Sequence, residues 1–129
     1  MDTKTKKGDD NRVFIGNFSN SIQLSGLIAD KPIFKEFKRA NGVVSLSASF
    51  ILIQNFMGHD KKFYPKKFIC TTRSPVIINE LKKYDRQIYV SCLGKIDYLW
   101  ESDKNRPYYY PLILEMAVEN VCDEKMRGI

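Results

Sequence analysis

Few residues of this 129-residue sequence have the types and spacing that enzymes use for catalysis. His59 is the single histidine, so it has no second imidazole with which to share a metal ion or a proton. Asp97 and Glu101 form a carboxylate pair in the sequence, but solvated charges at a strand edge account for them more simply. No glycine-rich phosphate loop occurs. We therefore expect no enzyme activity, no catalytic residue, no metal site, no cofactor and no small-molecule substrate.

The cysteines give no indication of a disulfide framework, a zinc site or a reactive thiol. Cys70, Cys92 and Cys122 are odd in number and far apart, and no C-x-x-C motif occurs, so neither a disulfide framework nor a zinc site is expected. Cys70 and Cys92 fall in apolar strand-like runs, where a thiol is inert. No apolar run is long enough to span a membrane, and residues 1–10 lack the apolar core of a signal peptide. We expect a cytoplasmic protein without a membrane partner.

Positive charge and aromatic side chains are interleaved in two stretches. Residues 59–67 (HDKKFYPKK) place four lysines around two aromatics, and residues 100–110 (WESDKNRPYYY) place a tryptophan and three tyrosines around a turn. Cations track phosphates, and aromatic faces stack on unpaired bases. The net charge of +6 also favours an anionic partner, although a basic soluble domain without such a partner has the same composition.

Alternation of apolar and polar residues predicts the strands that must position these stretches. The predicted strands span residues 22–28, 34–38, 44–52, 66–72, 87–99 and 108–121. Pro32 stops or bends the first of them, and Asn41-Gly42 predicts a hairpin turn. Within residues 44–52, three serines (Ser45, Ser47 and Ser49) are expected to form an open polar face. The opposite face, expected to be buried, consists of Val44, Leu46, Ala48, Phe50 and Leu52.

A single short helix interrupts the strands. Ser74 is a predicted N-cap, Pro75 fits the first helical position, and the helix should end around Tyr84. With residues 22–28 and 34–38 counted as one strand bent at Pro32, the resulting order is three strands, a helix and two strands. A small antiparallel sheet of this kind must close on itself or protect its edges. We therefore predict an all-β fold with one short helix: a five-stranded Greek-key OB-fold barrel with the helix between strands 3 and 4.

Several short motifs add a family resemblance over about residues 20–121. They are residues 20–32 (NSIQLSGLIADKP), 41–47 (NGVVSLS), the helix at 77–84 followed by 87–90 (QIYV), and 94–96 (GKI). In this order and spacing the chain resembles the bacterial and phage single-stranded DNA-binding proteins. The resemblance implies an OB fold, single-stranded DNA as the partner, and self-assembly as a homodimer or homotetramer. The last residues, DEKMRGI, lack the acidic aromatic tip common in that family, which suggests a divergent tail-less member, for instance one carried by a phage or plasmid.

The opening of the chain contains two similar apolar runs, and only one of them can start the barrel. The run beginning at Asn20 is followed by Pro32 and Asn41-Gly42 at family-like distances, so it is the better start. We therefore expect residues 1–10 to be a disordered arm and residues 11–19 to be an extra strand that pairs with an edge or a neighbouring subunit. The OB-fold domain then spans residues 20–122, and residues 123–129 form a short tail.

The resemblance and the two interleaved stretches together indicate which residues would hold a nucleic acid. The predicted stacking residues are Phe56, Tyr64, Trp100 and Tyr108, with Phe63 as a substitute for Tyr64. The predicted phosphate contacts are Lys35, Lys38, Arg39, Lys62, Lys66, Lys67 and Arg106. Some of them have a plainer explanation: Phe56 could belong to the core, Trp100 to a subunit interface, and the lysines to a solvated surface.

These observations lead to one hypothesis about function and two alternatives. The hypothesis is a protein that coats and protects unpaired DNA with little sequence preference during replication or recombination, through base stacking and phosphate contacts. The first alternative is a primosome-like interaction module that docks other replication proteins and binds nucleic acid weakly. The second is RNA binding, because OB folds accept RNA readily and the sequence does not separate the two.

Overall fold

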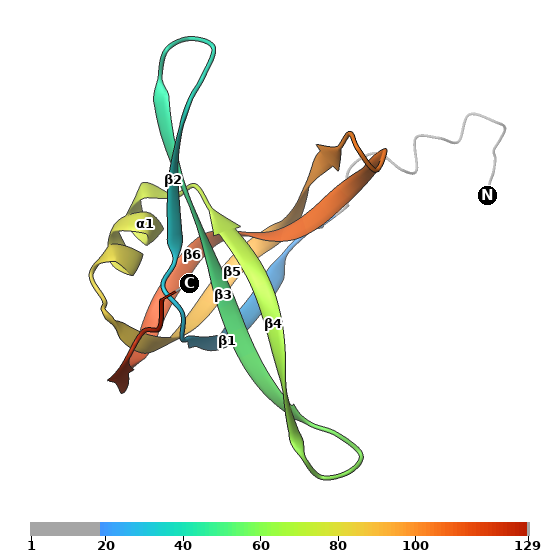
Figure 1. Cartoon of the computed structure of the whole chain (residues 1–129), viewed down its shortest axis with the longest axis vertical. Helices are drawn as coiled ribbons and strands as arrows, with labels where there is room; N and C mark the ends of the chain where they lie inside the picture. Colours follow the sequence, from blue (N-terminus) through green and yellow to red (C-terminus); the bar gives the residue numbers. More distant parts are fainter. Residues whose placement is uncertain (1–18, 129) are drawn as a thin grey trace, which may run out of the picture.

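The computed structural model describes residues 19–128, in which six strands and one helix follow each other along the chain (Figure 1). They are β1 (Ile22–Ile28), β2 (Ile33–Lys38), β3 (Val44–Met57), β4 (Phe63–Thr72), α1 (Pro75–Lys82), β5 (Arg86–Glu101) and β6 (Arg106–Lys125). The arm expected at residues 1–10 and all but the last residue of the extra strand expected at 11–19 lie outside the described residues.

Five of the strands form a closed ring. β1 pairs with β5, β5 with β6, β6 with β4, β4 with β3, and β3 returns to β1 through Leu27 opposite Ile53. Only the β4–β6 pairing is parallel. β2 extends the sheet beyond β3 and is separated from β1 by a bend that contains Pro32. Taken as one bent strand, β1 and β2 give the predicted order, so the OB-fold arrangement with a helix between the third and fourth strands is confirmed.

The helix α1 begins where the sequence predicts it. Ser74 Oγ accepts a hydrogen bond from the Ile77 N–H at 3.3 Å, and Pro75 occupies the first turn, where its missing N–H costs nothing. The helix ends at Lys82, two residues before the predicted end. Its buried side chains are Ile77, Ile78 and Leu81, which join the hydrophobic core of the ring.

The hydrophobic core is built by alternate residues of the strands. Phe50 and Leu52 of β3, Cys70 of β4, and Val90 and Cys92 of β5 are fully enclosed. The one buried polar side chain among the described residues, Thr72, is satisfied because its hydroxyl donates to the Ile113 carbonyl at 2.9 Å.

The segment after β6 also belongs to the folded body. Met126 is buried in the core cluster, and Arg127 exchanges main-chain hydrogen bonds with Ala29 and Lys31 at 3.1 and 3.0 Å. Arg127 further pairs with the Asp30 carboxylate at 3.5 Å. The end of the described chain therefore closes over the bend between β1 and β2.

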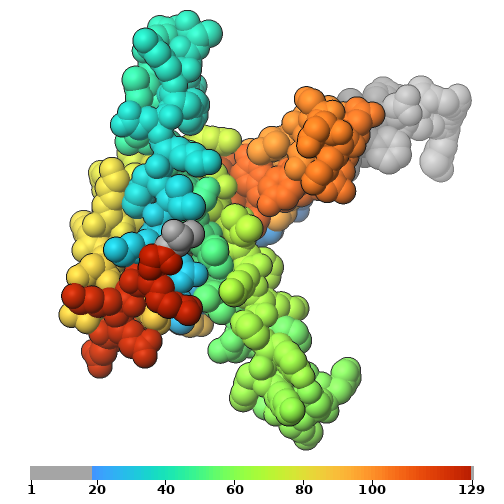
Figure 2. Space-filling view, viewed as in Figure 1, coloured from blue at the N-terminus to red at the C-terminus, as the bar shows by residue number. Residues whose placement is uncertain are grey.

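Three hairpins project beyond the ring as separate arms (Figures 1 and 2). They are the ends of β2–β3, β3–β4 and β5–β6, and they exist because these strands are longer than the ring needs. β3 continues to Met57 rather than Leu52, and β4 begins at Phe63 rather than Lys66. Parts of the two interleaved stretches that lie outside the predicted strands, such as residues 63–65, are therefore paired strand.

The β2–β3 arm corrects one prediction about the core. Val44 and Leu46 share the alternation of Ala48, Phe50 and Leu52, yet 58% and 40% of their surfaces are exposed. Both lie on the part of β3 that has left the ring, where no second layer covers them. The alternation predicts the correct face but cannot show where the core ends.

Gly94 is required for the sharp bend in the β5–β6 pair. A Cβ at this position would overlap the carbonyl oxygen of Leu112 across the pair, next to a shift in the β5–β6 register. We therefore expect Gly94→Ala to lower the free energy of unfolding by about 1–3 kcal/mol, measured by urea denaturation. The control is Gly128→Ala, because a methyl group there would meet no atom within 4 Å. Equal stability of both variants would contradict this account of the bend.

The thiols of the core cysteines, Cys70 and Cys92, should be unreactive in the native protein. Burial raises the pKa of Cys70 to about 12, with a smaller contribution from nearby Cys92, and burial raises the pKa of Cys92 to about 12 as well. Because a thiol whose pKa is raised stays protonated below that value, neither should react at pH 8. Iodoacetamide followed by mass spectrometry should modify only the partly exposed Cys122 in the native protein and all three cysteines in denaturant. Rapid native labelling of Cys70 or Cys92 would refute their burial.

Candidate nucleic-acid interface

The outer face of the β2–β3–β4 sheet, opposite the core, carries two lysines and three serines alongside apolar side chains such as Ile33 and Ile69. The strand register places Lys35 opposite Ser47 across β2–β3, and Lys67 opposite Ile53 across β3–β4. Alternation puts the remaining outward residues of the three strands on this same surface, and none of them is acidic. We call this surface the outer face. Because the side chains of its three serines are short, an extended chain can approach these strands closely.

The β2–β3 arm continues the outer face with an ordered arginine. Arg39 Nε donates to Ser45 Oγ at 2.6 Å, and its guanidinium carbon lies 6.0 Å from the centre of the Phe37 ring. Phe37 and Ser45 are opposite each other in the register, so all three side chains share this side of the arm. Arg39 is therefore held in place while most of its donors remain free.

Arg73, which sequence analysis did not select, connects the outer face to the β5–β6 arm. Its guanidinium donates to the Tyr110 hydroxyl at 3.1 Å and lies 4.0 Å from the Asp97 carboxylate. It also lines a hollow of about 290 Å³. The other residues around this hollow are Arg39, Val44, Ser45, Leu46 and Pro75. Two arginines from different elements thus converge on one depression.

Tyr108 extends this path onto the β5–β6 arm. Its ring is stacked on that of Tyr110, with centroids 6.3 Å apart and planes 20° apart, and Tyr110 in turn contacts Arg73. Tyr110 is buried, whereas 40% of the Tyr108 surface is exposed. Tyr110 is thus the supporting residue, and Tyr108 is the member of the stack that a ligand can reach.

The β3–β4 arm carries a second aromatic cluster, which lies on the other side of its strands. Phe56 and Tyr64 are opposite each other, with ring centroids 6.2 Å apart, and Lys66 Nζ lies 4.6 Å from the centre of the Phe56 ring. Lys67, the next residue, points to the outer face. The two lysines that sequence analysis grouped together therefore face opposite sides of β4.

Hydrogen bonds order the turn beside this cluster. The Asp60 carboxylate accepts from the Tyr64 hydroxyl and from the Lys62 N–H. The Tyr64 hydrogen bond, supported by that of Lys62, holds the pKa of Asp60 below its usual value, and the same contact raises the pKa of Tyr64. Lys62 is exposed at the tip of the arm.

The β5–β6 arm separates two other predicted residues. Trp100 lies on the side that carries Tyr98 and Tyr109, whose ring centroids are 6.0 Å apart. Tyr108 lies on the opposite side, together with Arg106, which pairs with the Glu101 carboxylate at 3.2 Å. The predicted stacking residues therefore form three groups: Phe56 with Tyr64, Tyr108 beside Arg73, and Trp100 alone on its own side.

The predicted phosphate contacts are divided in the same way. Lys35, Arg39 and Lys67 belong to the outer face or to its continuation on the β2–β3 arm. Lys38 is opposite Val44, on the other side of that arm. Lys62 is at the tip of the β3–β4 arm, Lys66 is on the opposite side of β4 from Lys67, and Arg106 is at the end of the β5–β6 arm. None of the three lines the hollow of Arg39 and Arg73.

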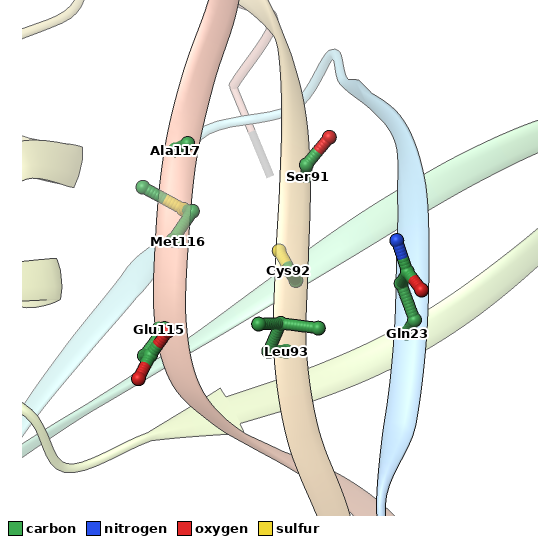
Figure 3. A pocket seen from close by; sticks show the side chains of 7 residues that line it. All are labelled: Gln23, Ser91, Cys92, Leu93, Glu115, Met116 and Ala117. Atoms are coloured by element: carbon green, nitrogen blue, oxygen red, sulfur yellow. The ribbon is translucent and has the colours of Figure 1, made fainter.

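A different hollow, of about 240 Å³, lies on the β1–β5–β6 sheet (Figure 3). Gln23, Ser91 and Ala117 line it, together with the Glu115 carboxylate, and no lysine or arginine does. A phosphate would meet an anion here without a compensating cation, so this hollow does not suit a nucleic-acid backbone.

The part of the chain that the structure describes offers little for other chemistry. Within residues 19–128, no group of three or more histidine, cysteine, aspartate or glutamate side chains could hold a metal ion. The helix described here is too short to cross a lipid bilayer.

Comparisons with known proteins agree with the geometry at the level of the fold. No protein-family model and no curated protein sequence matches the chain. Among solved structures, the Plasmodium falciparum SSB in complex with ssDNA matches with a TM-score of 0.61 at 18% identity, covering 81% of this chain and 98% of that chain. The small single-stranded DNA-binding protein from Streptomyces coelicolor matches with a TM-score of 0.54 at 15% identity, covering 80% and 96%. The chain therefore shares the fold of these single-stranded DNA-binding proteins.

Proposed function

We propose that this protein binds single-stranded DNA along the outer face with little sequence preference, and so covers unpaired DNA of the kind that arises in replication or recombination. The observation that carries the proposal is the convergence of Arg39 and Arg73 on one hollow. Lys35 and Lys67 lie on the outer face, and Arg73 contacts Tyr110, on whose ring Tyr108 is stacked. Both solved structures described above are single-stranded DNA-binding proteins by name.

The chemistry of this surface suits a single strand. Four cations contact phosphates: Lys35, Arg39, Lys67 and Arg73. Phe37 and Tyr108 offer exposed rings on which unpaired bases stack, a contact worth about 1–3 kcal/mol per base. The bases of a duplex are paired and stacked inside it, so they are not available to these rings. A duplex would therefore be bound only through contacts between cations and phosphates. Stacking reads no base edge, so little sequence preference follows.

The binding experiment follows from these contacts. Affinity for fluorescein-labelled oligo(dT) should greatly exceed affinity for a duplex of the same length. It should also fall with salt, because the bound cations release counterions from the phosphates. Four contacts predict a slope of log affinity against log salt of about −2.8. Fluorescence anisotropy at several salt concentrations measures both. Equal binding of duplex and single strand, or no binding at low salt, would overturn the proposal.

The two adjacent lysines of β4 test which face the DNA follows. Lys67→Glu removes a cation from the outer face, so it should weaken oligo(dT) binding and make the salt slope shallower by about 0.7. Lys66→Glu is the matched control, because it makes the same change of charge one residue away on the opposite side of the strand. Equal losses in both variants would place DNA on both sides of the arm and contradict a path confined to the outer face.

The alternatives predict other results in the same assay. A primosome-like interaction module with weak nucleic-acid binding would show little anisotropy change even at low salt. Oligo(U) in place of oligo(dT) measures any preference between DNA and RNA, because the 2′-hydroxyl is the group that lets a protein distinguish them. Self-assembly as a homodimer or homotetramer stays a prediction, which sedimentation without DNA measures directly.

A further inference from the structure

A third hollow lies on the outer face itself, and side chains from all three of its strands surround it. Its volume is about 160 Å³. The residues around it are Ile33 of β2, Ser49, Phe50 and Ile51 of β3, and Ile69 of β4. Pockets that enclose a whole small molecule usually measure about 300–1,000 Å³. This space therefore suits one group of a larger ligand that lies across the sheet. We call it the isoleucine hollow.

The isoleucine hollow exists because one short side chain stands among longer ones. Ser49 lies in the middle strand, opposite Ile33 of β2, and the next outward pair along β3 is Ile51 with Ile69. The serine side chain is the shorter, so it forms the floor while the isoleucines form the walls. Ile33 and Ile69 expose 44% and 56% of their surfaces. Solvent therefore meets an aliphatic depression at this point of the outer face.

The two lysines of the outer face flank this hollow. Lys35 is the next outward residue of β2 after Ile33, and Lys67 is the outward residue of β4 that precedes Ile69. The register places Lys35 opposite position 47 of β3 and Lys67 opposite position 53, on opposite sides of the hollow. At about 3.3 Å per residue these positions are about 20 Å apart. An extended polyanion that contacts both lysines therefore crosses the hollow between them.

The lining selects the kind of group that can enter. No lysine or arginine is among the residues around the hollow, and the Ser49 hydroxyl is the one polar side-chain group. A phosphate placed there would lose its hydration without gaining a cation, and the polar edge of a base would lose hydration in the same way. An aliphatic group instead gains from being buried among isoleucines.

We propose that the isoleucine hollow is a site for one thymine base, whose 5-methyl group enters between the isoleucines while the DNA strand runs from Lys35 to Lys67. The proposal rests on the proposed function, because it requires DNA on the outer face. Thymine is the one standard base that carries an aliphatic group on its edge, and apolar side chains are the usual partners of that methyl group. Burial of one methyl group corresponds to about fourfold tighter binding per site than for the same base without it.

This site adds a limited preference to an otherwise unselective interface. Stacking on Phe37 or Tyr108 tolerates any base, so the preference applies to one position along the bound strand and DNA of any sequence is still covered. Uracil lacks the 5-methyl group, so the hollow favours DNA over RNA without any contact to the 2′-hydroxyl. Oligo(dU) separates the two effects, because it combines the deoxyribose of oligo(dT) with the base of oligo(U).

The affinities of oligo(dT) and oligo(dU) of equal length, measured by fluorescence anisotropy, test the site. The native protein should bind oligo(dT) about fourfold more tightly. Ser49→Val fills the floor of the hollow with a residue that suits a strand, so the difference between the two oligomers should disappear. The matched control is Ser47→Val, the same change on the same strand and face at a position that does not line the hollow. Its preference should persist, and a loss of affinity common to both oligomers cancels in the ratio.

Ile69→Ala gives a second readout by removing a wall instead of filling the floor. The Ile69 side chain is largely exposed, so the variant should fold, and urea denaturation checks this for all three variants. Its preference for oligo(dT) should fall as well. Equal binding of the two oligomers by the native protein, or a preference retained in both Ser49→Val and Ile69→Ala, would overturn the thymine site and leave the proposed function intact. No binding of either oligomer at low salt would overturn both.

Discussion

Closure of the sheet is the constraint on which the rest of this structure depends. Five strands can form a ring only where the chain permits a close approach between main chains, and two glycines provide it. A Cβ at Gly26 would meet the Ile53 carbonyl oxygen and the Leu52 side chain where β1 joins β3, and a Cβ at Gly94 would overlap Leu112 where β5 and β6 bend. Because the ring closes at these points, the five ring strands bury one face in the core where they lie within the ring and leave the other face exposed.

The candidate interface follows from strands that are longer than the ring. Once β3 leaves the core, neither of its sides is covered, and side chains on adjacent positions face different surroundings. Lys66 stacks on Phe56 while Lys67 joins the outer face, although they are neighbours in sequence. A binding surface on such arms is therefore defined by alternation and register, and not by clusters of similar residues along the chain.

This distinction explains what could be predicted from the sequence. The order of elements and the helix start were accessible because the Ser74 cap and the apolar alternation are local signals, and the core positions Ala48, Phe50 and Leu52 follow the same rule. The length of the arms could not be predicted from the sequence, because Val44 and Leu46 continue the alternation beyond the core. Arg73 could not be selected either, since its partners Tyr110 and Asp97 come from the β5–β6 arm, and only the tertiary fold brings them together.

The β5–β6 arm shows that the two sides of one hairpin can differ in character. Its Tyr108 side is tied to the folded body through Tyr110 and Arg73 and carries charge at Arg106 and Glu101. Its Tyr98 side is uncharged. A polyanion gains nothing from an uncharged surface except stacking, whereas on the Tyr108 side an exposed ring and the Arg73 guanidinium are linked through Tyr110. Aromatic content alone therefore does not identify the side of the arm that binds nucleic acid.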